Sequence, residues 1–277
     1  SEIKQGMGLY AAGASSAPSG FGIDTWGFDY GLLDCACILL GNRVHYLDAR
    51  TNDIMAEAFK RVSREEIFGV TGLQFIQLNT IFQLYAMRHL GDPQLDYADR
   101  FLLTPDLLNY WLTGRQAGEY TIASTTQLLD ARTRRWSAEL MDRLDLPVAI
   151  MPDLVEPGTV LGPILPQVAA ETGLAPGAQV IAVGSHDTAS AVAAVPGLDQ
   201  NSLYISSGTW SLMGIETPAP IINDQVLAYN YTNEGGVANT IRFLKNSTGL
   251  WLVQECRNQW LRAGDQYDWG ELMALAE

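Results

Sequence analysis

The chain has 277 residues, enough for one large domain or two domains of ordinary size. Hydrophobic residues make up 47% of it and charged residues 17%, a composition that can bury a substantial core and is not that of a disordered protein. The formal net charge of −14 argues against binding to nucleic-acid phosphates or to anionic lipid, so we expect neither nucleic acid nor a membrane as a partner.

The first part of the chain predicts a helix, a loop and then strands. Residues 1–12 resemble part of a helix and not a leader peptide, and no apolar run approaches the roughly 20 residues of a membrane span. A short loop at 14–20 leads into strand and turn at 21–24. Residues 27–48 then predict two strands around a glycine–asparagine turn at 41–42.

The cysteine content favours a reducing compartment. Cys35, Cys37 and Cys256 form an odd, sparse set that makes no disulfide framework. No second pair of Cys or His residues complements the first two at zinc-ligand spacing, so we expect a structural role for them and no metal site. We therefore expect a cytoplasmic protein.

The middle of the chain predicts three helices. Apolar side chains recur at helical spacing over residues 77–90. A second helix opens with Thr104 as N-cap and Pro105 at the first helical position, and it stops at Gly114. The third helix is expected at 137–144.

Beyond a proline-rich passage the pattern becomes α/β. The expected elements are a buried strand at 180–183, a small-residue helix at 188–195, a hairpin of 203–206 and 210–215, a strand at 241–244, and a helix at 247–261 with Leu250, Val253 and Trp260 on one face. Pro196-Gly197 and the polar residues after it suggest a boundary near 196–200. We expect an α/β protein with two lobes, residues 1–198 and 199–277.

Residues 185–187 place a serine, a histidine and an aspartate side by side. Three consecutive side chains cannot converge on one point as a hydrolase triad must, because neighbours in an extended segment point to opposite faces. The G-x-S-x-G elbow is missing as well. A metal site at His186 would need further ligands, and the only other histidines are His45 and His89.

Asp187 has two interpretations that its local sequence leaves open. It follows a buried strand and precedes a helix, and such strand ends are where open α/β sheets place ligands. A carboxylate there can accept a proton from a substrate hydroxyl, which is the acid–base task in kinases. Alternatively, Asp187 only caps the helix that begins at Thr188.

The segment from Ile205 to Gly214, "ISSGTWSLMG", is the second candidate for binding chemistry. Backbone amides of such a turn can cradle a phosphate, and Thr209 adds a side-chain donor. Serine–glycine turns are common and most are only turns. A turn of this size soon after Asp187 is more telling than either feature by itself.

Seven motifs together resemble the FGGY family of carbohydrate kinases, and within it the branch of rhamnulokinases. They extend in order from about residue 20 to 260 and are, in sequence, "GIDTWGFDYGLLD" (22–34), "LDART" (47–51), "STTQLLD" (124–130), "GSHDTASAV" (184–192), "ISSGTWSLMG" (205–214), "TNEGG" (232–236) and "FLKNSTGLWLVQE" (243–255). The resemblance implies a two-lobed fold of the actin-like, ribonuclease-H-like type, with a sugar bound in the cleft.

The same resemblance implies a reaction and its residues. The γ-phosphate of ATP would pass to the 1-hydroxyl of L-rhamnulose in rhamnose catabolism, with Mg²⁺ on the phosphates. Asp187 matches the catalytic base of the family. The positions that match sugar contacts are Gly27, His186, Thr188 and Asn246, beside Asp187 itself. The positions that match ATP contacts are Thr209, near the phosphates, and Gln254. Trp26 is expected either beside the sugar or in the core.

Two departures from the family pattern keep alternatives open. Leu47 stands where related rhamnulokinases usually carry an arginine before the Asp-x-Arg element, although Asp48 and Arg50 remain. A sibling kinase for L-fuculose or D-xylulose is therefore an alternative. The N-terminal glycine-rich phosphate motif and the C-terminal adenosine-binding segment of the family have no equivalent here. We therefore expect a central fragment, incomplete at both ends and inactive by itself, with a non-catalytic protein that binds a sugar or a partner as the rival. The sequence does not indicate an oligomeric state.

Overall fold

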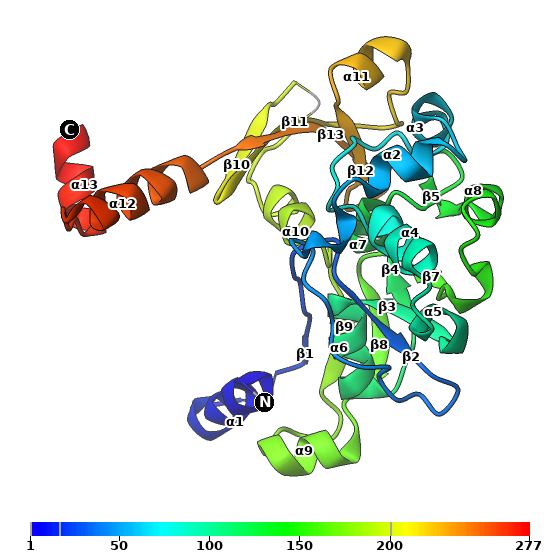
Figure 1. Ribbon diagram of the computed structural model, residues 1–277. Helices are drawn as coiled ribbons and strands as arrows, with labels where there is room; N and C mark the ends of the chain where they lie inside the picture. Colours follow the sequence, from blue (N-terminus) through cyan, green and yellow to red (C-terminus); the bar gives the residue numbers. More distant parts are fainter. Residues whose placement is uncertain (1, 17, 200) are drawn as a thin grey trace.

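The computed structural model describes residues 2–16, 18–199 and 201–277. Ser1, Ala17 and Gln200 belong to the expected first helix, the expected loop and the expected lobe boundary, and they lie outside the described residues. The described chain mixes helices with small sheets, which agrees with the expected α/β class (Figure 1).

The helices of the structure have the following bounds. They are α1 Glu2–Gly13, α2 Ile54–Phe59, α3 Arg64–Thr71, α4 Thr80–Leu90, α5 Gln94–Tyr97, α6 Thr104–Thr113, α7 Tyr120–Ala123, α8 Ala138–Arg143, α9 Pro166–Thr172, α10 Asp187–Ala193, α11 Asp224–Ala228, α12 Trp251–Ala263 and α13 Trp269–Ala276, with 3-10 turns η1 Ala49–Thr51, η2 Ser124–Thr126 and η3 Val148–Ile150.

The strands are mostly short and belong to several small sheets. They are β1 Gly20–Phe21, β2 Tyr30–Leu33, β3 Arg100–Leu103, β4 Gly118–Glu119, β5 Leu129–Asp130, β6 Arg135–Trp136, β7 Leu154–Val155, β8 Thr159–Pro163, β9 Gln179–Ala182, β10 Tyr204–Ser207, β11 Trp210–Thr217, β12 Thr232–Gly235 and β13 Ile241–Thr248.

A three-stranded sheet brings the segments that follow β1 and β9 next to each other. Strand β1 pairs parallel with β9, and β9 pairs antiparallel with β8. Beyond the ends of the first two strands, the parallel pairing reappears as a bridge between Thr25 and His186. The segments that follow β1 and β9 therefore lie side by side at the carboxyl edge of the sheet, where ligands bind in α/β folds.

A four-stranded antiparallel sheet, in the order β10-β11-β13-β12, forms the second support. Its register places Glu234 of β12 directly opposite Arg242 of β13. It also places Leu212 of β11 opposite Asn246 of β13. Side chains directly opposite each other on neighbouring strands contact one another, so this register decides which polar groups meet.

Two apolar clusters hold these sheets and helices in place. The larger one includes fully buried Phe82, Phe101 and Ile122, and it joins α4, β3 and α7. The smaller one includes Val180 of β9 and Val168 of α9. Because packed interiors deform little, these clusters give the carboxyl edge of the first sheet a fixed position.

The three helices expected in the middle of the chain are confirmed as α4, α6 and α8. Helix α6 ends at Gly114, which has a positive φ of 78°. Helix α8 begins after Ser137, whose side chain caps it by accepting the Leu140 amide. Thr104 is the first helical residue and not the N-cap, a position that Leu103 takes without a side-chain bond. The strand at 180–183 and the hairpin of 203–215 are confirmed as β9 and as β10 with β11.

The predicted pair of strands within residues 27–48 is wrong. Only β2 forms there, and its partner in the ladder is the distant β3. Oδ1 of Asp34 accepts the amides of Ala36 and Ile38 at 2.9 Å, which turns the chain well before residue 41. An aspartate that bonds nearby amides competes in this way with strand pairing.

The predicted helix at 247–261 starts too early. Strand β13 continues to Thr248 because its last residues pair with the beginning of β11, and α12 begins only at Trp251. The expected shared face of Leu250, Val253 and Trp260 is not covered, since all three side chains are exposed. Helices α12 and α13 extend away from the rest of the molecule (Figure 1). The helix expected at 188–195 forms at Asp187–Ala193.

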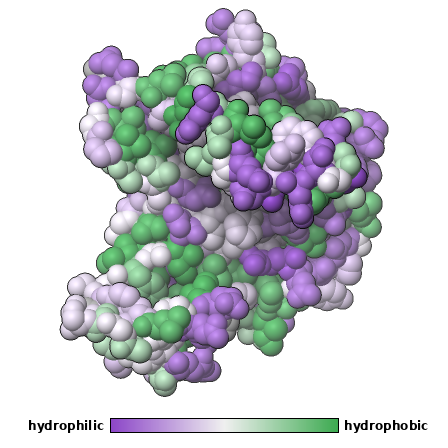
Figure 2. Space-filling model, turned by 90° about the vertical axis from the view of Figure 1, so that its left-hand side faces the viewer, coloured by the Kyte–Doolittle hydropathy of each residue, from purple (hydrophilic) through white to green (hydrophobic). Residues whose placement is uncertain are grey.

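The surface of the molecule is hollowed between an upper and a lower part (Figure 2). Among the residues that the structure describes, no helix combines the length and the apolar character that crossing a lipid bilayer requires. Cys35, Cys37 and Cys256 are all exposed thiols, so the expectation of a structural role for the first two is not met by burial.

Candidate functional site

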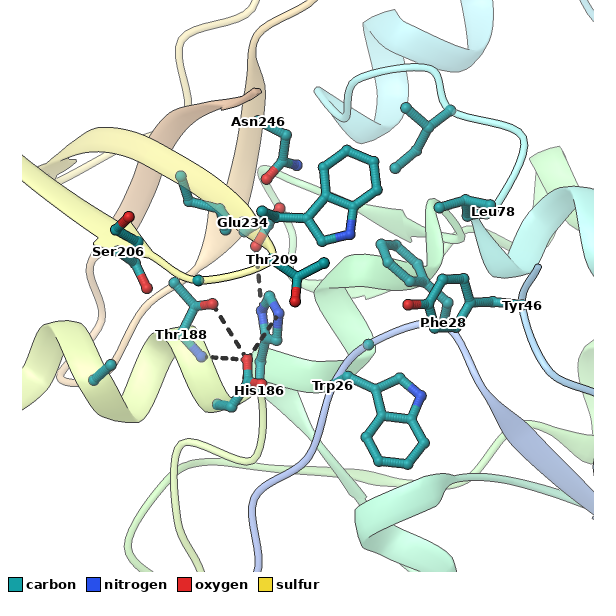
Figure 3. Close-up of a pocket in the computed structure, with 18 of the residues that line it drawn as sticks. Trp26, Phe28, Tyr46, Leu78, His186, Thr188, Ser206, Thr209, Glu234 and Asn246 are labelled. Carbon is teal, nitrogen blue, oxygen red and sulfur yellow. Dashed lines mark hydrogen bonds and ion pairs between the residues drawn. The ribbon is translucent and has the colours of Figure 1, made fainter. Parts of the chain in front are cut away.

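A cleft of about 650 Å³ receives side chains from both sheets (Figure 3). Its lining comes from the segment after β1, from His186 and helix α10 after β9, from the loops before η1 and α4, from β10 and the β10–β11 turn, and from strands β11, β12 and β13. The residues are Trp26, Gly27, Phe28, His45, Tyr46, Ile76, Leu78, His186, Asp187, Thr188, Ala191, Ser206, Ser207, Gly208, Thr209, Trp210, Leu212, Glu234 and Asn246.

The backbone of Ser185 and His186 is fixed by hydrogen bonds to the fully buried Glu119 and to Thr121. The Glu119 carboxylate accepts the amides of Thr121 and Ile122 and the Thr121 hydroxyl, at 2.6–3.1 Å. The same carboxylate accepts the amide of Ser185 at 3.0 Å, and the Thr121 hydroxyl accepts the amide of His186 at 3.2 Å. Burial raises the pKa of Glu119 more than these hydrogen bonds lower it. One carboxylate thus ties α7 to the segment that carries the candidate residues.

Asp187 contacts its own helix and still faces the cleft. Its amide donates to the carbonyl oxygen of Thr25 at 2.9 Å, which fixes the residue at the edge of the sheet. Oδ1 accepts the amide of Thr188 at 2.6 Å and its hydroxyl at 3.2 Å, and lies 3.6 Å from Nε2 of His186. The side chain is 56% exposed and lines the cleft. The carboxylate therefore faces the cleft, while the N-cap of α10 is His186 and Asp187 is the first helical residue, with its carboxylate bonded to the next amide and hydroxyl.

His186 is the meeting point of the two sheets. Its ring is nearly buried, and Nδ1 lies 2.9 Å from an Arg242 Nη2 atom and 3.2 Å from Oε2 of Glu234 (Figure 3 shows His186 beside Glu234). The guanidinium also donates to Oε2 of Glu234 at 3.0 Å. Burial by itself would raise the pKa of Glu234, but the charge of Arg242 and the contact with His186 lower it below the ordinary value.

An aromatic wall lies across the cleft from Thr188 and Thr209. Trp26, Phe28 and Tyr46 form it, with the aliphatic Leu78 beside them (Figure 3). The Trp26 ring is 46% exposed, and its Nε1 donates to Oδ2 of the buried Asp29 at 3.0 Å. Trp26 therefore lines the cleft and is not a core residue, and its bond to Asp29 limits how the ring can turn. Burial raises the pKa of Asp29 against this hydrogen bond.

The β10–β11 turn closes the third side of the cleft. The Gly208 amide donates to the carbonyl oxygen of Trp210 at 2.8 Å. The Gly249 amide donates to the carbonyl oxygen of Thr209 at 3.1 Å, and the Leu250 amide to that of Gly208 at 2.8 Å. A Cβ on Gly249 would lie only 2.5 Å from the Gly208 carbonyl oxygen, so glycine is required for this approach. The turn is thereby braced by the end of β13.

The structure brings together six of the seven predicted site residues. Those that line the cleft are Gly27, His186, Asp187, Thr188, Thr209 and Asn246. Gln254 lies on α12, outside the lining of this cleft. Ser185 is fully buried and its hydroxyl donates to the carbonyl oxygen of Val183 at 3.2 Å, so the rejection of a hydrolase triad stands.

Sequence reasoning missed Glu234 and Arg242. Glu234 lies in the motif "TNEGG" and Arg242 directly precedes the motif that begins "FLKN", but neither received a role. A signal was present, since Arg242 stands between Ile241 and Phe243 in an apolar strand. A charged residue at such a position is seldom buried unless a partner of opposite charge is present. The partner could not be identified without the register of β12 and β13.

The described residues include no cluster of three or more His, Cys, Asp or Glu side chains that could hold a metal ion. The site is thus an open cleft with one exposed carboxylate, an aromatic wall and a turn rich in hydroxyl groups. Such a site suits a polar ligand with a flat or apolar side, and a second ligand that approaches the turn.

The fold is that of two-lobed sugar kinases. The solved structures similar to it include the ligand-bound xylulose kinase from Lactobacillus acidophilus, with a TM-score of 0.84, 18% identity, and coverage of 95% of this chain and 53% of that chain. A second is the Plasmodium falciparum glycerol kinase with ADP, with a TM-score of 0.72, 15% identity, and coverage of 85% and 49%. This class has the actin-like, ribonuclease-H-like ATPase fold.

The chain belongs to the FGGY family of carbohydrate kinases. The profile of the N-terminal domain of this family matches residues 11–194, and the profile of the C-terminal domain matches residues 203–277. The curated relatives include the rhamnulokinases of Bacteroides thetaiotaomicron, 47% identical over 93% of this chain and 53% of that protein, and of Enterococcus faecalis, 47% identical over 92% and 50%. The chain spans about half the length of these relatives.

Proposed function

We propose that this chain forms the cleft of an ATP-dependent kinase that phosphorylates the 1-hydroxyl of L-rhamnulose. The single observation that carries the proposal is the exposed carboxylate of Asp187, set between an aromatic wall and a hydroxyl-rich turn. Identities of 39–47% to curated rhamnulokinases support the choice of substrate. We also propose two lobes, residues 1–198 and 199–277, and a cytoplasmic location, which the three free cysteines favour.

Asp187 would act as the general base. The contacts that the structure gives this carboxylate all use Oδ1, so the lone pairs of Oδ2 are left for a substrate hydroxyl. As the hydroxyl oxygen attacks the γ-phosphorus, its proton passes to Asp187, and the bond from the γ-phosphorus to the bridging oxygen breaks to release ADP. Positioning and charge compensation account for most of the rate of such a transfer.

The sugar would lie between the aromatic wall and the start of α10. Gly27 would meet the sugar through its backbone, and packing requires glycine at this position because a Cβ would lie 3.0 Å from the Thr125 side chain. His186, Thr188 and Asn246 would hydrogen-bond the sugar and discriminate against a hydroxyl pattern that leaves these groups unpaired.

The nucleotide would approach the β10–β11 turn, with Thr209 next to its phosphates. Mg²⁺ would accompany the nucleotide, and the phosphate oxygens, water and one or two carboxylates would hold it, as is usual for nucleotide-bound magnesium. Bound there, the ion would offset the negative charge of the phosphates. Gln254 is retained as an ATP contact, on a helix that would have to meet the nucleotide from outside this cleft.

The test joins residues 1–277 to the flanking segments of the Bacteroides thetaiotaomicron relative. With ATP, Mg²⁺ and L-rhamnulose, we expect ADP release from this chimaera and no appreciable turnover from residues 1–277 alone. If a folded chimaera that binds the ketose releases no ADP, the protein is a non-catalytic sugar-binding protein and the proposal is wrong.

A sibling ketose kinase is a second candidate because of Leu47. This side chain is 63% exposed, and it follows His45 and Tyr46, which line the cleft. We expect the chimaera to prefer L-rhamnulose over L-fuculose and D-xylulose by roughly tenfold or more in kcat/KM, which is the scale of one hydrogen bond gained or lost. Equal or reversed preference would assign the other sugar.

A further inference from the structure

Arg242 is the largest side chain that is completely buried, and its charge must be compensated inside the protein. The guanidinium has three polar contacts. Nε donates to the Gly235 carbonyl oxygen at 3.0 Å. The Nη2 atom lies 3.0 Å from Oε2 of Glu234 and 2.9 Å from Nδ1 of His186. Glu234 compensates the charge. The contact with the ring nitrogen is not needed for that compensation, so it calls for another explanation.

The two contacts of Nδ1 require opposite protonation states. Toward Glu234 the nitrogen would have to donate, and toward Arg242 it would have to accept. A guanidinium carries only donors and stays protonated, so the shorter contact is satisfied only if Nδ1 has no hydrogen. The two Nη2 hydrogens then serve Oε2 and Nδ1. With a hydrogen on Nδ1, two N–H groups would face each other at 2.9 Å.

The consequence lies at the other ring nitrogen. When Nδ1 accepts, the neutral ring carries its hydrogen on Nε2, because the bond made by one nitrogen sets the protonation of the other. Nε2 lies 3.6 Å from Oδ1 of Asp187, and His186 lines the cleft. His186 is thereby presented to the cleft as a hydrogen-bond donor without a positive charge.

We propose that Arg242 is a positioning residue that selects the Nε2–H tautomer of His186, so that the ring donates a hydrogen bond to an oxygen of the ketose. This inference rests on the proposed function for the identity of the acceptor, but the tautomer itself does not. Glu234 holds Arg242 in place from the directly opposite strand position and does not hold the ring.

The test measures the tautomer without turnover. Histidine in the chimaera is labelled with ¹⁵N, and the His186 signals are assigned by their loss in His186→Gln. We expect Nδ1 to resonate as an unprotonated nitrogen and Nε2 as a protonated one. Signals of a protonated Nδ1 would overturn the proposal, whether or not the chimaera is active.

Three variants separate the roles of Arg242 and Glu234. Glu234→Gln keeps the arginine donor, so we expect the Nε2–H tautomer to persist; a switch to Nδ1–H would mean that Glu234 sets the ring. Arg242→Lys keeps a positively charged donor group at this position and is expected to retain the tautomer. Arg242→Met removes that group and should lose the tautomer. Loss of the tautomer is expected to raise KM for the ketose roughly tenfold, with the KM for ATP unchanged. Equal changes in both KM values would indicate a structural role only.

If Arg242→Met does not fold, the proposal can still be overturned: a protonated Nδ1 in the unmodified chimaera, or a switch to Nδ1–H in Glu234→Gln, would each contradict it. A chimaera with the predicted tautomer but without activity on any ketose would refute the proposed function and leave the assignment of the ring intact. Activity on L-rhamnulose together with a protonated Nδ1 would refute the assignment of the ring and leave the proposed function intact.

Discussion

The Asp187 carboxylate is tied to its own helix through Oδ1 and is still more than half exposed to the cleft. Asp187→Asn keeps an oxygen that can accept the Thr188 amide but removes the proton acceptor. We expect turnover of the chimaera to fall by roughly 10²-fold or more, the usual scale for a general base, with little change in thermal unfolding. The measurement is steady-state ADP release.

The matched control for this change is Asp224→Asn. Asp224 is likewise the first residue of a short helix, α11, and it is not among the residues that line the cleft. We expect it to leave kcat unchanged. If Asp187→Asn retained full activity, the carboxylate would serve only as a helix cap.

Asp106 is a buried acid that the structure leaves half satisfied. Oδ1 accepts the Glu119 amide at 3.0 Å, while Oδ2 is buried without a partner. Burial, and then the nearby negative charge of Glu119, raises the pKa of Asp106 well above its ordinary value. The folded protein therefore holds this proton more tightly than the unfolded chain, and stability falls as pH rises from the ordinary value through the raised one.

Asp106→Asn imitates the protonated form at every pH. We expect it to increase the free energy of unfolding at about pH 8 and to have little effect at about pH 4, as measured by urea unfolding at both. A gain that does not depend on pH would show that the carboxylate charge is not the cause.

At the scale of elements, local pattern predicted helices α4, α6 and α8 and the hairpin of β10 with β11, but not the distant partners of the other strands. Helices α4, α6 and α8 carry their own signals in apolar spacing, proline and glycine, because their hydrogen bonds are local. The pairing of β2 with β3 joins residues about seventy positions apart, so the sequence around β2 contains no signal that predicts it. The same holds for the last residues of β13, which look helical until β11 is placed beside them.

The residues of the candidate site likewise fall into those that local sequence predicted and those that depend on distant strand pairing. Asp187 and the β10–β11 turn were found because each stands next to its strand in the sequence. Glu234 and Arg242 were not, because their meaning depends on a cross-strand register and on a ring that arrives from another sheet. Gln254 was named by resemblance alone, and the structure places it on α12.

Glu119 connects the elements around the cleft, so its removal should affect both stability and catalysis. Glu119→Ala leaves the buried amides of Thr121, Ile122 and Ser185 without an acceptor. We expect a loss of unfolding free energy of at least about 1–3 kcal/mol, the cost of one such group, together with a lower kcat because Asp187 is no longer held.

The control for this loss is Glu139→Ala, in the first turn of the exposed start of α8. Its carboxylate is exposed, and we expect a change below about 0.5 kcal/mol. Chemical unfolding measures both variants. Similar values for the two would contradict the connecting role of Glu119.

At the scale of the whole molecule, α12 and α13 contribute little to stability. Neither helix has a buried residue. Ending the chain at Trp251 should therefore leave the unfolding temperature of the remainder nearly unchanged. Ending it before β13 removes an internal strand of the four-stranded sheet and should abolish cooperative unfolding. Calorimetry of both truncated chains checks this, and a large drop for the first would show that the two helices are packed.

Strand β12 lies in the part of the chain matched by the C-terminal family profile, yet it is fastened to residues matched by the N-terminal one. The Gly235 amide donates to Oγ of Ser124 at 2.7 Å, and both the amide and the side chain of Asn233 donate to the Gly72 carbonyl oxygen. A swing about the connection near residue 198 would have to tear these bonds. Any closing motion must instead bend β13 after Leu244, where its pairing with β12 stops and the strand continues paired with β11 alone.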